Sequence, residues 1–123
     1  MKTNEVLENI KARRSVRAYT GQQVLEEDLQ AILEAATYAP SGMHLETWHF
    51  TAIQNMDKLT ELNERIKGAF AKSDDSRLQE RGHSKTYCCY YHAPTLVIVS
   101  NEPTQWWAGM DCADRKSTRL NSS

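Results

Sequence analysis

The chain has 123 residues, of which 40% are hydrophobic and 25% are charged, so we expect a single globular domain. The net charge of −1 argues against a nucleic-acid partner, and no apolar run approaches the roughly 18 residues of a membrane span. No apolar signal segment follows Met1, and two of the three cysteines are adjacent, which makes a poor disulfide framework. Reduced thiols and a cytoplasmic location are therefore expected.

The first third of the chain predicts two helices. A short helix is expected over residues 3–12, with Thr3 as its N-cap. A basic cluster occupies residues 13–17, and a second helix should end near Tyr38 because Pro40 disfavours helical geometry before it. The apolar stripe of this second helix consists of Leu25, Leu29, Ile32, Leu33 and Ala36.

The middle of the chain alternates strands and helices. Residues 48–53 predict a strand, and Asn55 is expected to cap a helix. The buried face of that helix should contain Leu59, Leu62, Ile66 and Phe70. Residues 72–82 are polar and predict a loop with at most a helical turn, and residues 87–92 predict a short helix or an irregular segment. A buried strand over 95–100 and the start of a helix over 106–113 follow.

Helices interleaved with few strands indicate an α+β domain whose sheet is flanked by helices. Two strands make a marginal sheet, which predicts that part of the domain is missing. The last ten residues, 114–123, match the translation of a common short-read sequencing adapter. We therefore expect native sequence over 1–113 and a non-native tail over 114–123, the alternative being an ordinary polar, disordered C-terminus.

The basic cluster is the first candidate for a binding site. Guanidinium groups offer planar donors suited to phosphate, and in an extended segment Arg13, Ser15 and Arg17 would face one ligand, with Arg14 turned away. An equally good alternative is a solvated basic face paired with the carboxylates at 26–28.

The second candidate is the loop at residues 40–44. Pro40 and Gly42 shape its backbone, Gly42 allows a ligand to approach closely, and Ser41 supplies a donor. Pro-Ser-Gly is also a common plain turn, so the loop alone indicates little.

The two motifs together resemble the N-terminal half of the nitroreductase family. The segment R-R-S-V-R precedes a helix, and A-P-S-G-M-H precedes W-H-F, over a likeness that runs from about Glu5 to Ala113. The resemblance implies a nitroreductase-like α+β fold and a homodimer with FMN at the subunit interface. The candidate cofactor-binding residues are Arg13, Arg14, Ser15, Arg17, Pro40, Ser41, Gly42 and His44.

The family also implies a role for each group. Arg13 and Ser15 would hold the phosphate and ribityl end, Arg17 would lie near the pyrimidine edge of the flavin, and the 40–42 loop would contact the partner's flavin. FMN would pass electrons from NAD(P)H to a nitroaromatic, a quinone or a similar acceptor, with no side chain as nucleophile. The alternative is a catalytically incompetent fragment that cannot hold FMN without its missing C-terminal half.

Three positions depart from the family pattern. His44 stands where Asn is usual, Glu46 where Gln is frequent, and Thr47 where Pro is usual. His44 can still donate or accept one hydrogen bond, whereas Glu46 would place a negative charge near the flavin unless it turns to solvent.

No metal is expected. The residues that invite a metal interpretation are His83, Cys88, Cys89 and His92, and their spacing fits none of the usual zinc patterns. Buried thiols and hydrogen-bonded histidines are the preferred interpretation, and packing is preferred to ligand stacking for Trp106 and Trp107.

Overall fold

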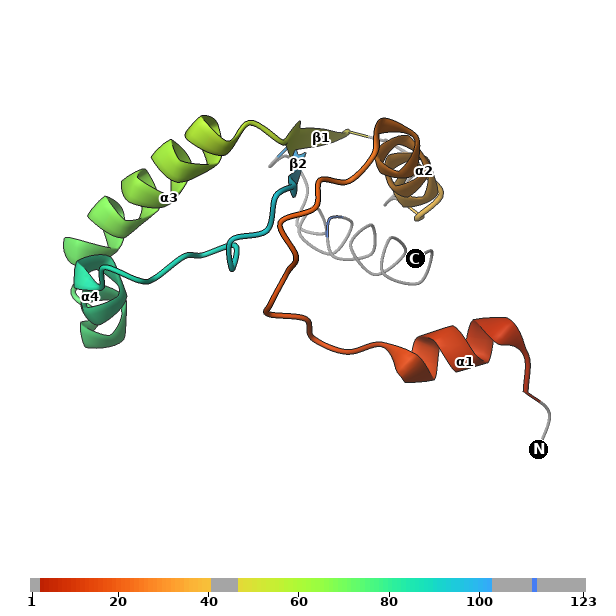
Figure 1. Cartoon of the computed structure of the whole chain (residues 1–123), viewed down its shortest axis with the longest axis horizontal. Coiled ribbons are helices and arrows are strands. Elements are labelled where there is room, and N and C mark those ends of the chain that lie inside the picture. The colour runs from red at the N-terminus through yellow and green to blue at the C-terminus, as the bar shows by residue number, and fades with distance from the viewer. Residues whose placement is uncertain (1–2, 41–46, 103–111, 113–123) are drawn as a thin grey trace. The chain divides into compact units, whose positions relative to one another are not determined.

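A computed structural model describes residues 3–40, 47–102 and 112 (Figure 1). Its elements in chain order are α1 (Glu5–Ala12), α2 (Glu26–Thr37), β1 (Trp48–Ile53), α3 (Met56–Ala71), α4 (Ser76–His83) and β2 (Leu96–Asn101). The α+β class is confirmed. The helix expected over 106–113 lies outside the described residues apart from Cys112, and so does the tail over 114–123.

The two strands pair in a single sheet (Figure 1). A hydroxyl-to-amide hydrogen bond joins Thr47 to Asn101 at one end, and Gln54 Nε2 donates to Thr95 Oγ1 at 3.0 Å at the other. The start of β1 therefore lies beside the end of β2, so the strands are antiparallel. Both strand predictions are confirmed, that for β2 with a shift of one residue.

The chain divides into two compact units, of which the first contains residues 1–15, 24–51 and 97–123. Within it, Leu29 and Ala36 of α2 are buried as the stripe predicts, and three carboxylates occupy the first turn, where the helix dipole favours them. The inclusion of Leu25 in the stripe is wrong: this residue precedes the helix as its N-cap and is exposed.

Helix α1 belongs to the same unit. The prediction of Thr3 as its N-cap is wrong by one residue, because Asn4 Oδ1 accepts from Leu7 N at 2.9 Å. The three apolar side chains of its helical face, Val6, Leu7 and Ile10, are 64%, 40% and 49% exposed. No residue of α1 is buried, so the apolar face of this helix is partly exposed.

The second unit contains residues 16–23 and 52–96, and its core forms beneath α3. Asn55 Oδ1 caps α3 through Lys58 N at 3.0 Å, as predicted, and Leu59 is fully buried. The residues that pack with Leu59 are Cys88, Tyr90 and Ala93, with partly buried Ile53, Cys89 and Leu96 around them. Of the other predicted core positions of α3, Leu62, Ile66 and Phe70 are half-buried.

A buried amide connects α3 to the segment beneath it. Asn63 donates from Nδ2 to Tyr87 O at 3.1 Å and accepts at Oδ1 from Cys89 N at 3.0 Å. Asn63 can be buried although it is polar, because its amide forms hydrogen bonds with the backbone carbonyl of Tyr87 and the backbone N–H of Cys89.

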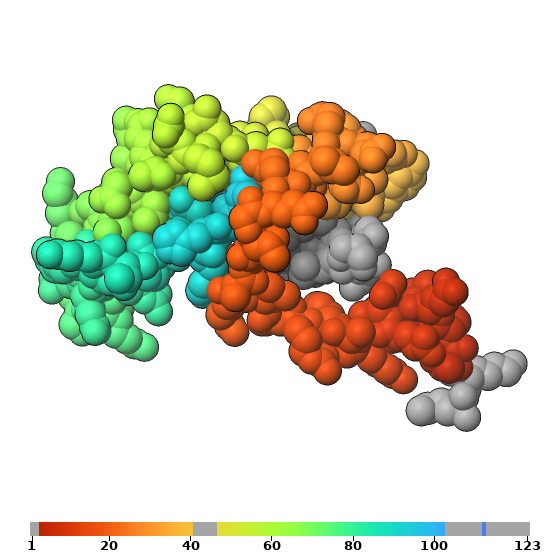
Figure 2. Space-filling view, in the orientation of Figure 1, coloured from red at the N-terminus to blue at the C-terminus, as the bar shows by residue number. Residues whose placement is uncertain are grey.

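Helix α4 lies mostly in residues 72–82, where the sequence predicts a loop with a helical turn as the alternative; the prediction of a loop is wrong. Asp75 Oδ1 caps it by accepting from Arg77 N and Leu78 N at 2.8 and 3.3 Å. The helix packs on the C-terminal end of α3 (Figures 1 and 2). Gly82 lies directly against the backbone of Ala71. Tertiary contact and a good cap therefore stabilise a helix that lacks an apolar stripe.

Residues 88–93 form two overlapping turns, which agrees with the predicted irregular segment. Tyr91 N donates to Cys88 O at 3.2 Å, and Ala93 N donates to Tyr90 O at 3.1 Å. Tyr91 and His92 have φ angles of 54° and 57°, in the left-handed region that residues other than glycine rarely adopt. This conformation costs about 1 kcal/mol at each residue.

Candidate functional site

The basic segment leaves the end of α1 as irregular, exposed chain. Arg13 has φ −53° and ψ 134°, an extended conformation that ends the helix, and residues 13–20 form neither helix nor strand. Arg13, Arg14 and Ser15 lie in the first unit, and Arg17 begins the second with Val16. All four side chains are exposed.

The guanidinium groups of this segment have no carboxylate partner among the described residues. The ion pairs formed within 3–40 and 47–102 are Lys58–Glu61, Arg65–Glu61 and Lys67–Glu64, all on α3. Pairing of the basic segment with the carboxylates at 26–28, the alternative considered from the sequence, is therefore not observed in this part of the chain. Exposed arginines without acidic partners suit an anionic ligand.

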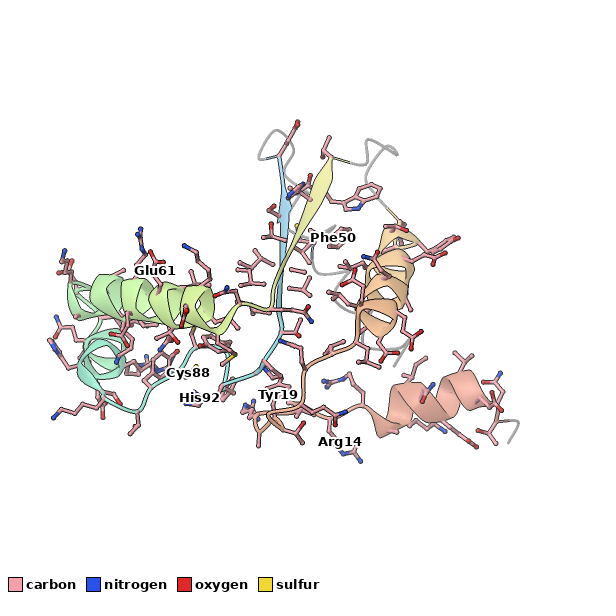
Figure 3. All side chains as sticks on the ribbon, turned by 45° about the horizontal axis from the view of Figure 1, so that its top comes forward. Arg14, Tyr19, Phe50, Glu61, Cys88 and His92 are labelled. Atoms are coloured by element: carbon pink, nitrogen blue, oxygen red, sulfur yellow. The ribbon has the colours of Figure 1, made fainter. Side chains whose placement is uncertain are left out.

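Arg14 differs from its neighbours. Its Nη1 donates to Lys11 O at 3.0 Å and to Arg13 O at 2.9 Å, so this guanidinium satisfies carbonyl groups at the end of α1 (Figure 3). The side chain is turned back on its own helix, whereas no such bond joins the side chains of Arg13 and Arg17 to the part of the chain that the structure describes.

The segment that carries Arg17 is held in the second unit by Gln23. Its Nε2 donates to Pro94 O at 3.0 Å and to Gln54 O at 3.3 Å, and its Oε1 accepts from Gln54 Nε2 at 3.2 Å. Tyr19 adds a local bond from its hydroxyl to Val16 O at 3.2 Å. The sequence does not indicate this role of Gln23, because nothing in the neighbouring residues predicts that an exposed glutamine forms hydrogen bonds to distant segments.

The second candidate motif is only partly described. Pro40 follows the buried Ala39 after α2 and is exposed, whereas Ser41, Gly42, His44 and Glu46 lie outside the described residues. Thr47, which stands where the family usually has Pro, bonds through its hydroxyl to Asn101. That departure therefore gives the start of β1 a side-chain bond to β2 that proline could not form.

No group of three or more His, Cys, Asp or Glu side chains within 3–40 and 47–102 is arranged to hold a metal ion. Across those same residues, no helix combines the length and the apolar character that crossing a bilayer requires.

Within 3–40 and 47–102, three groups have shifted pKa values. A hydrogen bond from Arg65, with the charge of Lys58, lowers the pKa of the exposed Glu61 on the outer side of α3 (Figure 3). Burial raises the pKa of the Cys89 thiol, and the adjacent Cys88 adds to this rise. Burial also raises the pKa of Tyr90, again with a contribution from Cys88.

The raised pKa values of Cys89 and Tyr90 predict a loss of stability at alkaline pH. The unfolded chain releases these protons more readily than the folded chain, so the stabilisation is complete below about pH 8.5 and falls as pH rises through the folded-state values. Urea unfolding should show a lower midpoint at pH 10 than at pH 7. The drop should shrink in Cys89→Ser and Tyr90→Phe and stay unchanged in Tyr91→Phe, whose ring is exposed. An equal drop in all variants would contradict this assignment.

The described residues form an α+β domain with an exposed arginine segment after its first helix, and this segment has no carboxylate partner among them. The Nitroreductase family model matches residues 10–119, and the chain belongs to the nitroreductase family. It is similar to a Bacteroides fragilis nitroreductase crystallised with bound FMN, with 74% sequence identity and a TM-score of 0.96. The matched region covers 98% of this chain and 64% of that one. A Desulfitobacterium hafniense nitroreductase with bound FMN gives 30% identity and a TM-score of 0.87, covering 98% and 65%.

A curated relative from Archaeoglobus fulgidus, named provisionally an NADH dehydrogenase/NAD(P)H nitroreductase, is 38% identical over 60 residues. That match covers 49% of this chain and 34% of the relative, so the chain spans about a third of that protein by sequence and under two thirds of the Bacteroides fragilis structure. The similarity to the solved structures confirms the predicted nitroreductase-like fold.

Proposed function

We propose that this chain is the FMN-binding N-terminal part of an oxidoreductase that passes electrons from NAD(P)H through FMN to a nitroaromatic, a quinone or a similar acceptor. The observation that carries the proposal is an exposed arginine segment with no carboxylate partner among the described residues, in a chain 74% identical to a nitroreductase with bound FMN. The provisional name of the Archaeoglobus fulgidus relative supports NAD(P)H as the electron donor.

The chemistry of the donor set fits FMN. A phosphate monoester is a dianion that accepts several hydrogen bonds, and the side chains of Arg13 and Ser15 are exposed to supply them. Arg17 is proposed to lie near the pyrimidine edge, where a cation stabilises the negative charge of the reduced flavin and raises its potential. Bound FMN supplies the hydride and electron chemistry, so no side chain is assigned as nucleophile. The bonds of Arg14 to Lys11 O and Arg13 O support a role in fixing the end of α1 next to Arg13 and Ser15.

We further propose a homodimer in which residues Pro40, Ser41, Gly42 and His44 contact the flavin of the partner subunit. The apolar face of α1, formed by Val6, Leu7 and Ile10, supports an additional protein surface over this helix, because three exposed apolar side chains on one face favour burial. The free thiols of Cys88 and Cys89 suit a reducing compartment, which supports a cytoplasmic location.

Substitution of the proposed phosphate and pyrimidine ligands should weaken FMN binding. A charge-assisted hydrogen bond contributes about 1.5–3 kcal/mol, so Arg13→Ala and Arg17→Ala should each raise the Kd for FMN by roughly 10- to 100-fold. Quenching of flavin fluorescence on titration with the chain measures this Kd.

Arg77→Ala is the matched control, because Arg77 is an exposed arginine on α4 with no side-chain partner among the described residues. It should leave the Kd unchanged. Equal losses in all three variants would indicate nonspecific attraction between the anion and any surface arginine. Failure of the unsubstituted chain to bind FMN would favour the catalytically incompetent fragment instead.

A further inference from the structure

Two adjacent free thiols lie beneath α3 and have no part in the proposed flavin site. Cys88 is buried, with 7% of its surface exposed, and Cys89 is half-buried. The side chain of Tyr90 follows them into the same core. Cys112, the third cysteine of the chain, is also free and lies in the other unit.

The backbone around the two thiols is fixed from both sides. Asn63 of α3 holds Cys89 through its backbone N–H at 3.0 Å, and Cys88 Sγ accepts from His92 N at 3.3 Å across the overlapping turns. The left-handed Tyr91 and His92 make this return possible, because they reverse the chain within the turn. These two bonds fix the sulfur of Cys88 and the backbone of Cys89 on one turn.

The geometry of neighbouring residues disfavours a direct bond between these sulfurs. Consecutive Cα atoms are about 3.8 Å apart across a trans peptide, below the roughly 4.4–6.8 Å found for disulfides. A third atom bonded to both sulfurs enlarges the ring and relieves this constraint. Zinc in structural sites takes four ligands, and the described residues bring no third His, Cys, Asp or Glu to the pair. The pair therefore suits a soft acceptor that needs two sulfur ligands.

We propose that Cys88 and Cys89 form a chelating dithiol site for trivalent arsenicals of the type R–As(OH)2. Two As–O bonds break and two As–S bonds form, and each thiol proton leaves with a hydroxyl group as water. The arsenic remains trivalent, so the reaction requires no oxidant or reductant.

Phenylarsine oxide, which is hydrated to this type of compound in water, is the probe for the full 123-residue chain. Intact mass spectrometry and thiol counting should show one arsenical per chain and the loss of two of the three thiols. Cys112→Ser should bind equally well, whereas Cys88→Ser and Cys89→Ser should each weaken binding at least tenfold. Retention of tight binding in both of these variants, or its loss in Cys112→Ser, would overturn the proposal.

Thermal unfolding separates binding by the folded turn from binding by an unfolded chain. A ligand of the folded state raises the melting temperature as its concentration increases. Phenylarsine oxide should therefore raise the melting temperature of the unsubstituted chain and of Cys112→Ser, and leave that of Cys89→Ser unchanged. A melting temperature that falls with added arsenical would show that only the unfolded chain binds, and would refute the site. Since Cys89 is half-buried, Cys89→Ser keeps the test decisive if Cys88→Ser fails to fold.

Discussion

Replacement of Leu59 by Ala is expected to lower the free energy of unfolding by about 3 kcal/mol. Leu59 is fully buried and contacts the residues that close the core of the second unit, including Cys88, Tyr90 and Ala93. Truncation removes apolar surface from this core and leaves a cavity, because α3 is held in place by its own hydrogen bonds. A small domain has only about 5–15 kcal/mol of net stability, so the loss is a large part of the total. Urea unfolding followed by circular dichroism measures it.

Met56→Ala is the matched control for this substitution. Met56 lies in the first turn of the same helix and is 52% exposed, so its truncation should cost less than about 1 kcal/mol. Equal costs for the two variants would show that Leu59 does not anchor the core as described.

Gly82→Ala is expected to destabilise the chain by about 2 kcal/mol, although alanine is the better helix former. A Cβ at this position would overlap Ala71 N and lie 2.7 Å from both Ala71 Cα and Lys67 O. These are backbone atoms of α3, so α4 must move away. Such overpacking costs about 1–3 kcal/mol, which exceeds the gain of up to about 1 kcal/mol in helix propensity.

Gly68→Ala is expected to change the stability in the opposite direction. Gly68 lies within α3, and a Cβ there would meet nothing within 4 Å. The substitution should therefore stabilise the chain by about 0.5–1 kcal/mol through helix propensity alone. If both alanine variants were stabilised, the close contact between α3 and α4 would be refuted.

The elements with a strong periodic pattern could be predicted from the sequence. The prediction for β1 agrees at both ends, and α2 and the Asn55 cap of α3 were also correctly placed. Each of these has a local signal: alternating or aromatic residues, an apolar stripe, or a capping side chain before it.

The elements that depend on tertiary contact could not be predicted. Helix α4 contains one large apolar residue, Leu78, so it has no apolar stripe that would predict a helix. The helix depends on the contact of Gly82 with α3. Asn63 is polar, so an apolar pattern leaves it out, yet it is buried because Tyr87 and Cys89 bring it two backbone partners. Nothing in the residue types of Tyr91 and His92 indicates their left-handed conformation.

For the candidate site, the sequence indicated which residues to consider and the structure distinguished among some of them. The composition of the arginine segment suggested both a phosphate site and a salt-bridged surface, and the absence of carboxylate partners among the described residues favours the first. Arg14 was included with its neighbours because residue type alone cannot show that its guanidinium bonds to the carbonyls that end α1.

The central claim is that this chain recognises FMN through its phosphate end. The most direct measurement is a fluorescence titration of the 123-residue chain with FMN and, separately, with riboflavin, which lacks the phosphate. Loss of one or more charge-assisted hydrogen bonds predicts that FMN binds at least about tenfold more tightly than riboflavin. Equal affinity for the two flavins, or no binding of FMN, would contradict the assignment of Arg13 and Ser15 as the phosphate ligands.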